Sequence, residues 1–323
     1  MALLREVQEC SVGVARPRPL TIFIIHPSEV LTDHLPHGDG TVAWGFIREL
    51  AGRGHRLHVA CERTDLLEPL PVNVSLHPIR TRERAGAAKT LQYMRGCRAL
   101  FNRLRRRAAF DVAHQLNPVF GGLSLALLGT GVPIVLGPYV AAWPSDCDGP
   151  PVAQPRLSAH LKRMLLYLQQ RPAAALLVTT RAALETRIVD TRAIRERVRW
   201  QQHGIDVAAF APPPDGRATA LASAQILFLA NVGIRKGIFT LLEAFARLRV
   251  VRPDATLVIA GRGAPLEQVR LRVAELGVGE AVAVLGNVPR ANVAALMHQS
   301  AVYCLPSFGE PYGMSAIEAM AAG

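Results

Sequence analysis

The sequence predicts an α/β protein with two similar Rossmann-like, parallel-sheet domains. Short apolar segments rich in β-branched residues alternate along the chain with segments whose apolar residues recur at helical spacing. One proline-rich linker, Ala211–Gly216, interrupts this alternation, because three consecutive prolines prevent a helix and remove donors from a strand. With 323 residues, 50% of them hydrophobic, the chain is long enough for about two domains. We therefore expect an N-terminal domain over residues 1–210 and a C-terminal domain over residues 211–323.

The expected N-terminal domain begins with Leu20–His26, a nearly continuous apolar run that is typical of a parallel strand covered on both faces. Apolar residues at helical spacing follow over Thr41–Arg53, and glycines close this first helix. The alternation then continues to residue 202. It predicts strands at Arg56–Cys61, Asn73–Pro78, Phe110–Gln115, Pro133–Gly137, Ala174–Thr179 and Val198–Gln202, and helices at Ala87–Ala108, Gly122–Leu128, Leu157–Gln170 and Arg181–Ile194.

The expected C-terminal domain repeats the pattern, and its ligands should bind beyond the carboxyl ends of its strands. The sequence stops at Gly323, directly after an apolar helix, so we expect this domain to be incomplete and C-terminally truncated. We expect a piece of this form to be poorly stable or inactive. The predicted strands are Gln225–Ala230, Thr256–Ala260, Val282–Leu285 and Val302–Leu305, and the predicted helices are Phe239–Val250, Leu266–Leu276, Asn292–Gln299 and Met314–Met320.

The net charge of +12 is concentrated in the first two thirds of the chain. Residues 1–212 carry 27 basic and 17 acidic side chains, a net +10, whereas residues 213–323 carry 10 and 8, a net +2. Such an excess attracts polyanions, which include nucleic acid, an anionic membrane surface and a phosphorylated substrate. Few aromatic residues accompany the arginines, so we do not expect a nucleic-acid platform.

The cysteines and the N-terminal residues favour a cytoplasmic protein. The five cysteines are odd in number and lack the spacing of a zinc site, which fits a reducing compartment without a metal centre. Residues Met1–Pro19 contain no apolar run long enough for the core of a signal peptide. We therefore expect a cytoplasmic location, at the inner face of the membrane if the protein binds lipid.

The segment from Pro306 to Gly323 carries the most specific chemistry. Glu310 falls in a Gly/Pro loop, and Glu318 falls inside an otherwise apolar helix, where a carboxylate is costly without a partner. A ligand with hydroxyl groups is one such partner, and a nearby arginine is the alternative. Gly313 at the helix start lets backbone N–H groups face a phosphate.

Glu310 and Glu318, separated by seven residues, resemble the E-x7-E motif of the retaining glycosyltransferases of family 4, which have the GT-B fold. Several other segments resemble motifs of that family in the same order, so the similarity covers nearly the whole chain. These segments are Arg53–His55, His203–Asp206, Leu227–Gly237, Leu241–Phe245, Leu257–Gly263 and Leu285–Val288.

The resemblance implies a metal-independent transferase that moves a hexosyl unit from a nucleotide diphosphate sugar to an acceptor with retention of configuration. Its two domains would face each other across a cleft, and the C-terminal domain would hold the donor. Glu310 would contact the transferred sugar, Glu318 the ribose and Lys236 the diphosphate. Backbone groups of Gly233, Gly313, Met314 and Ser315 would complete the donor site. Beyond the donor, the family needs no cofactor.

Three positions depart from the family pattern. Asn231 stands where an arginine is frequent, and Arg235 either replaces that cation or is a solvated loop residue. His114 keeps only the first histidine of an H-x-H motif, and is either close to the sugar or an ordinary histidine at a strand end. His203 replaces the asparagine of the N-G-I-D segment at the crossing between domains.

Gly38 and Gly40 resemble the family's glycine loop between the first strand and the first helix, where the backbone approaches the donor phosphates and the acceptor. The same residues match the dinucleotide pattern G-x-G-x-x-A. About 11 residues separate them from the strand, however, whereas the dinucleotide turn follows its strand at once.

Residues Arg80–Arg107 contain ten basic side chains and one acidic side chain, together with apolar residues at helical spacing. We expect this helix either to lie on an anionic membrane or to pack in the core with solvated arginines. A sugar, lipid-linked or phosphorylated acceptor would fit an enzyme of cell-surface polysaccharide or glycolipid synthesis. The alternatives are a GT-B phosphorylase or epimerase, and a basic nucleic-acid-associated protein without transfer activity.

Overall fold

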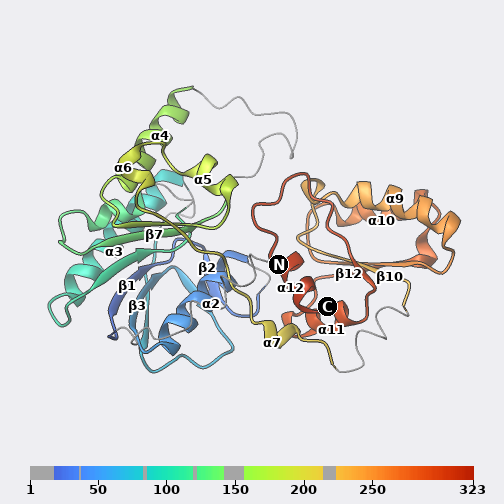
Figure 1. Ribbon diagram of the computed structural model, residues 1–323, viewed down its shortest axis with the longest axis horizontal. Helices are drawn as coiled ribbons and strands as arrows, with labels where there is room; N and C mark the ends of the chain where they lie inside the picture. The colour runs from blue at the N-terminus through green and yellow to red at the C-terminus, as the bar shows by residue number, and fades with distance from the viewer. Residues whose placement is uncertain (1–17, 36–37, 83–85, 119–121, 142–155, 214–222) are drawn as a thin grey trace, which may run out of the picture.

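The computed structural model describes residues 18–35, 38–82, 86–118, 122–141, 156–213 and 223–323. Two parallel sheets with flanking helices lie side by side, joined by the segment that contains α7 (Val207–Phe210) (Figure 1). The first sheet has the strand order β5-β3-β1-β6-β7-β8-β9. These strands are β1 (Thr21–Ile25), β3 (Arg56–Cys61), β5 (Val74–Pro78), β6 (Val112–Gln115), β7 (Ile134–Tyr139), β8 (Ala175–Val178) and β9 (Val198–Trp200).

The β1 strand is buried on both faces because its residues alternate between two hydrophobic clusters. Ile22 and Ile24 pack with Trp44 and Ile47 of helix α2 (Gly38–Gly52). Phe23 and Ile25 pack on the opposite face, with helix α3 (Gly86–Leu104). The nearly continuous apolar run of the sequence is therefore explained by helices on both sides of the sheet. Further elements of this half are η2 (Leu123–Leu127), α4 (Arg156–Gln170), α5 (Arg181–Arg187) and α6 (Arg192–Arg195).

The second sheet has the order β12-β11-β10-β13 and is also parallel. Helices α9 and α10 cover one face, and α11 packs on the other. Phe210 of the joining segment lies in the cluster on the α11 face. The elements are β10 (Gln225–Leu229), η3 (Ile234–Lys236), α9 (Ile238–Val251), β11 (Thr256–Ala260), α10 (Leu266–Glu275), η4 (Gly279–Ala281), β12 (Val282–Gly286), α11 (Arg290–His298), β13 (Val302–Tyr303) and α12 (Met314–Ala321).

Several elements differ from the sequence expectations. Val30–Thr32 (β2) and Arg63–Asp65 (β4) pair in a small separate sheet that the sequence did not indicate. The helix expected at Gly122–Leu128 is a 3-10 helix over η2. The helix expected over Arg181–Ile194 is divided into α5 and α6, because the Gln170 side chain accepts a hydrogen bond from Val189 N at 2.9 Å and holds an extended segment there.

Most of the apolar side of the basic helix α3 faces the protein, and only Leu91 among its large apolar side chains is exposed, at 46%. Tyr93, Leu100 and Phe101 are buried, and Met94 and Leu104 pack against the same cluster. The core-packed alternative is therefore correct for these apolar side chains. Exposed arginines remain on the outer side, whereas Arg84 of the expected segment lies outside the described residues.

None of the helices in the described parts of the chain is long and apolar enough to cross a bilayer. Of the expected linker Ala211–Gly216, only residues up to Pro213 fall within the described ranges.

Candidate active site

The candidate site lies where two loops leave the carboxyl ends of adjacent strands. One loop follows β10 and leads through η3 into α9, and the other follows β13 and leads into α12. Phe308 N donates to the carbonyl oxygen of Arg235 at 2.9 Å, so the two loops are joined directly. Gly237 has a φ of 72°, and a Cβ there would overlap the carbonyl oxygen of Pro306. Only glycine permits this close approach of the loops.

The approach of the loops brings Lys236 to Glu310. The Lys236 Nζ donates to Glu310 Oε2 at 2.5 Å, and Ser307 Oγ donates to the same oxygen at 3.1 Å. The two charged side chains are only 13% and 26% exposed. Partial burial strengthens their attraction, and neither side chain is fully covered.

Glu318 is buried in α12 and pairs with Arg290 of α11. Its side chain is 7% exposed, and Oε1 lies 2.9 Å from Arg290 Nη1. The Arg290 guanidinium also lies over the ring of Phe210, at 5.7 Å from the centroid. The sequence left two possible partners for Glu318, a ligand hydroxyl and a nearby arginine, and the structure contains the arginine. A contact between Glu318 and the ribose of a donor is therefore a proposal.

Tyr303 at the end of β13 contacts the first turn of α12. Its hydroxyl donates to Ser315 Oγ at 2.7 Å and lies 3.2 Å from the carbonyl oxygen of Leu229. Burial raises the pKa of Tyr303 to about 12, and the negative charges of Glu310 and Glu318 add to this shift. Tyr303 therefore ties the carboxyl ends of β10 and β13 to the first turn of α12.

The start of α12 completes the arrangement. Gly313 precedes the helix with a φ of 78°, and a Cβ there would lie 3.1 Å from Glu310 Cγ. The first N–H groups of a helix, here those of Met314 and Ser315, have no partners within it and form its positive end. A cation, a helix N-terminus and two carboxylates are suited to a ligand that carries both phosphate and hydroxyl groups.

The other predicted donor-site residues are placed as follows. Asn231 is exposed, whereas Gly233 and Arg235 are half-buried, and all three lie in the loop between β10 and α9. Gly38 and Gly40 belong to the first turn of α2, so their expected position in a loop is wrong. Asp39 in this turn favours the earlier start, because a carboxylate stabilises the positive end of a helix.

His114 occupies a buried position within the first sheet and is 5% exposed. Its Nε2 donates to the carbonyl oxygen of Gly137 at 2.9 Å, and its ring contacts Phe46 edge to face. Burial lowers its pKa to about 4. These contacts agree with the second of the two alternatives for His114, an ordinary histidine at the end of a strand.

The crossing segment contacts the candidate site through a residue that the sequence did not single out. Tyr312 OH donates to the carbonyl oxygen of His203 at 3.0 Å. Three residues further on, Asp206 caps α7 by accepting from Ala209 N, and lies 3.5 Å from Arg48 of α2. The position of Tyr312 between Glu310 and Gly313 in the sequence could have indicated that it belongs to the candidate site. No local pattern in the sequence indicates this for Tyr303 or Arg290.

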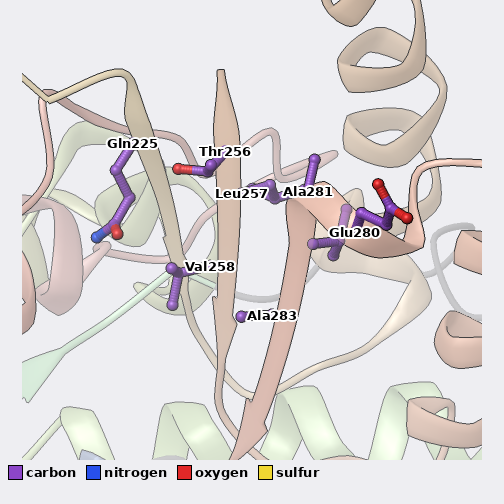
Figure 2. Close-up of a pocket in the computed structure, with 8 residues that line it drawn as sticks. Gln225, Thr256, Leu257, Val258, Glu280, Ala281 and Ala283 are labelled. Carbon is purple, nitrogen blue, oxygen red and sulfur yellow. The ribbon is translucent and has the colours of Figure 1, made fainter. Parts of the chain in front are cut away.

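A separate hollow of about 230 Å³ lies at the amino ends of β10, β11 and β12 (Figure 2). It is at the edge of the sheet opposite the Lys236 loop, and none of its lining residues is basic. It is therefore not the anion-binding site. The lining residues are Gln225, Thr256, Leu257, Val258, Glu280, Ala281, Val282 and Ala283.

Two parallel-sheet units of this kind define the GT-B class of glycosyltransferase folds. The structure resembles a sucrose-phosphate synthase from Thermosynechococcus elongatus with a TM-score of 0.68 and 19% identity, over 94% of this chain and 79% of the other. The family model for Glycosyltransferase Family 4 matches residues 36–209, and that for Glycosyl transferases group 1 matches residues 218–323. The chain therefore belongs to glycosyltransferase family 4, which confirms the expected fold class and family.

Curated relatives match over shorter regions. The glycogen synthase of Mycobacterium tuberculosis is 32% identical over 122 residues, which are 38% of this chain and 29% of that protein. The phosphatidyl-myo-inositol mannosyltransferase of Mycolicibacterium smegmatis is 36% identical over 123 residues, 38% of this chain and 31% of that protein. The matched region thus spans less than a third of either relative.

Proposed function

We propose that the protein transfers a hexosyl unit from a nucleotide diphosphate sugar to an acceptor, with retention of configuration. The observation that carries the proposal is the contact between Lys236 and Glu310 beside the N-terminus of α12. This arrangement offers positive charge for a diphosphate and, next to it, a carboxylate for sugar hydroxyls.

In the proposed reaction, the bond between the anomeric carbon and the diphosphate breaks, and a bond to an acceptor oxygen forms. Negative charge then grows on the departing diphosphate. Lys236 and the N–H groups of Met314 and Ser315 stabilise this charge without rearrangement, and so lower the barrier. These groups supply the positive charge, so we propose that no divalent ion is required.

The two glutamates hold the remaining parts of the donor. Glu310 accepts hydrogen bonds from the transferred sugar after the diphosphate has replaced it as the partner of Lys236. Glu318 accepts from the ribose hydroxyls while its other contact, the ion pair with Arg290, holds its side chain in position. Arg235, Asn231 and Gly233 line the diphosphate from the loop after β10.

From the first half of the chain, we propose that the N-terminal turn of α2 with Gly38 and Gly40 faces the acceptor side of the donor. His114 supports that region through its bond to Gly137 rather than by touching the sugar. The relative named a phosphatidyl-myo-inositol mannosyltransferase and the basic charge of this half favour a lipid-linked or phosphorylated acceptor. Synthesis of a cell-surface glycolipid or polysaccharide at the inner membrane face fits these features.

The test combines donor binding with turnover. Thermal shifts with UDP, GDP and ADP sugars should identify one donor that raises the melting temperature. Glu310→Gln should keep this shift but lose at least about 100-fold in transfer rate, because it removes charge without changing shape. Glu280→Gln, at the opposite edge of the sheet, is the matched control.

Wild-type turnover by folded Glu310→Gln would refute the assignment. Transfer from a sugar 1-phosphate to the acceptor with release of inorganic phosphate, and no need for a nucleotide, would instead identify a phosphorylase. Isomerisation of the sugar without any acceptor would identify an epimerase.

A further inference from the structure

Helix α4 buries polar side chains and exposes apolar ones. Gln169 and Gln170 on its inner side are 1% and 0% exposed. Leu161, Met164 and Leu168 are 51%, 50% and 42% exposed, and Tyr167 beside them is also exposed. An amphipathic helix of a globular protein normally shows the opposite arrangement. We call these four exposed residues the outer apolar stripe.

The buried glutamines anchor α4 to the rest of the protein. Gln169 Nε2 donates to Gln115 Oε1 at 3.1 Å, and its Oε1 accepts from Gly122 N. Gln170 Nε2 donates to the carbonyl oxygen of Arg187 at 2.8 Å, and its Oε1 accepts from Val189 N. These polar groups are satisfied, so α4 is held in place by hydrogen bonds on its inner side. The outer apolar stripe is not needed for this attachment.

The outer apolar stripe is continuous along the helix. Leu161, Met164 and Leu168 follow the spacing i, i+3, i+7, which places them on one face over about 10 Å. Several exposed apolar side chains in one row, unlike single ones, indicate a contact surface.

The charge around α4 shows what kind of surface can cover it. Between Asp148 and Glu185 the chain has five basic residues and no acidic residue. Among these, Arg163 and Arg171 are exposed, and Arg181, also exposed, lies 3.8 Å from Glu185 at the border of this stretch. Two copies of the chain meeting symmetrically through this face would bring arginines against arginines. A lipid surface with anionic headgroups meets both requirements, since it offers phosphates to the arginines and an apolar boundary to the stripe.

Helix α3 and the turn after it carry further exposed positive charge in this half of the chain. The helix packs against η2, as α4 does. Arg95 and Arg103 of this helix are exposed, as are Arg105, Arg106 and Arg107 in the turn that follows it, whereas most of its apolar side chains are turned to the core. The arginines of α3 therefore contribute attraction to anionic lipid, and α4 provides the side chains that can enter it.

We propose that α4 is a membrane-docking helix that binds the surface of an anionic bilayer through the outer apolar stripe. The proposal does not depend on which donor or acceptor the protein uses, and its test does not require turnover.

The experiment measures binding of the full chain to two kinds of vesicle, phosphatidylcholine alone and phosphatidylcholine mixed with phosphatidylglycerol. We expect co-sedimentation with the anionic vesicles, weaker binding to the neutral ones, and a decrease as salt is raised. A triple variant, Leu161→Gln with Met164→Gln and Leu168→Gln, should bind anionic vesicles at least about tenfold more weakly.

The matched control replaces three exposed apolar residues on the helices of the second sheet, as Val250→Gln, Val251→Gln and Leu271→Gln. This variant should bind vesicles as the wild type does. Circular dichroism melts show whether each variant is folded. If the triple variant does not fold, a double variant with Arg163→Gln and Arg171→Gln tests separately whether positive charge contributes to vesicle binding. That variant should also bind anionic vesicles less tightly.

Absence of wild-type binding to anionic vesicles overturns the proposal, as does equal binding by the folded triple variant. A wild-type dimer in light scattering that the triple variant abolishes, without vesicle binding, would show that the stripe joins two copies of the chain.

Discussion

The Tyr312 hydroxyl donates to the carbonyl oxygen of His203 at 3.0 Å, and the two rings meet edge to face with centroids 4.7 Å apart. Tyr312 follows Glu310 by two residues, whereas His203 belongs to the segment that crosses between the two sheets. The contact therefore ties the crossing segment to the loop that carries Glu310. Burial lowers the pKa of His203 to about 4, so its ring is neutral in this contact near pH 7.

Replacing Tyr312 tests this connection. Tyr312→Phe keeps the ring contact and removes the hydrogen bond, which should lower kcat about fivefold, since one such bond contributes about 1 kcal/mol. Tyr312→Leu loses both contacts and should lower kcat further, with a smaller change in KM. Unchanged kcat in both folded variants would show that the contact does not position the loop.

Lys236→Met should reduce kcat/KM for transfer by about 100-fold or more, because the developing charge on the diphosphate loses its side-chain cation. Titration calorimetry with the free nucleoside diphosphate should show weaker binding by the variant. Lys89→Met removes the partner of Glu62 in the first half of the chain and serves as the control for loss of one lysine. Equal donor affinity in Lys236→Met and the wild type would exclude the diphosphate role.

Gly237→Ala should destabilise the protein by more than about 2 kcal/mol, because a Cβ there is strained by the positive φ and also overlaps Pro306. Gly277 has a similar φ of 67° but open space around it, so Gly277→Ala should cost only about 1 kcal/mol. Urea denaturation of both variants separates backbone strain from the overlap. Equal losses would show that the two loops can move apart.

Arg290→Met should lower the free energy of unfolding by about 1–2 kcal/mol, because it leaves the buried Glu318 carboxylate without its cation. The value lies below that of a fully buried pair, since the Arg290 side chain is 40% exposed. Combining Arg290→Met with Glu318→Gln should recover part of the loss. Additive losses in this double-mutant cycle would mean that the two groups do not interact.

The pKa of His114 predicts a loss of stability in acid. Its pKa is lowered to about 4 in the folded protein, below the ordinary value of 6.5, so the unfolded chain binds the proton more tightly. Its contribution is complete above about pH 6.5 and decreases as the pH falls towards 4, by at most about 3 kcal/mol. His114→Gln keeps a donor for Gly137 and removes the titration.

In urea denaturation, the His114→Gln variant should therefore lose less free energy of unfolding than the wild type when the pH is lowered from 7.5 to 5. Equal losses in the two proteins would assign the acid sensitivity to other groups, such as His203.

Local patterns in the sequence were sufficient for the order of the strands in the two large sheets, for most of the helices and for the two-sheet fold. The β1 strand shows why, since a strand buried on both faces must be apolar throughout. The division between α5 and α6 could not be predicted, because the hydrogen bond that causes it comes from Gln170 on another helix. The outer apolar stripe of α4 could not be predicted either, because the sequence does not show which face of a helix is buried.

For the candidate site, the sequence by itself determined the chemical groups, Lys236, Glu310, Glu318 and the glycine before α12, because their spacing in loop and helix is local. Only the tertiary structure decided their partners. Lys236 meets Glu310 across 74 positions, Arg290 neutralises Glu318 from another helix, and Tyr312 reaches His203 across 109 positions. Such contacts depend on how strands pair and loops pack, and no local pattern encodes a partner so far away in the chain.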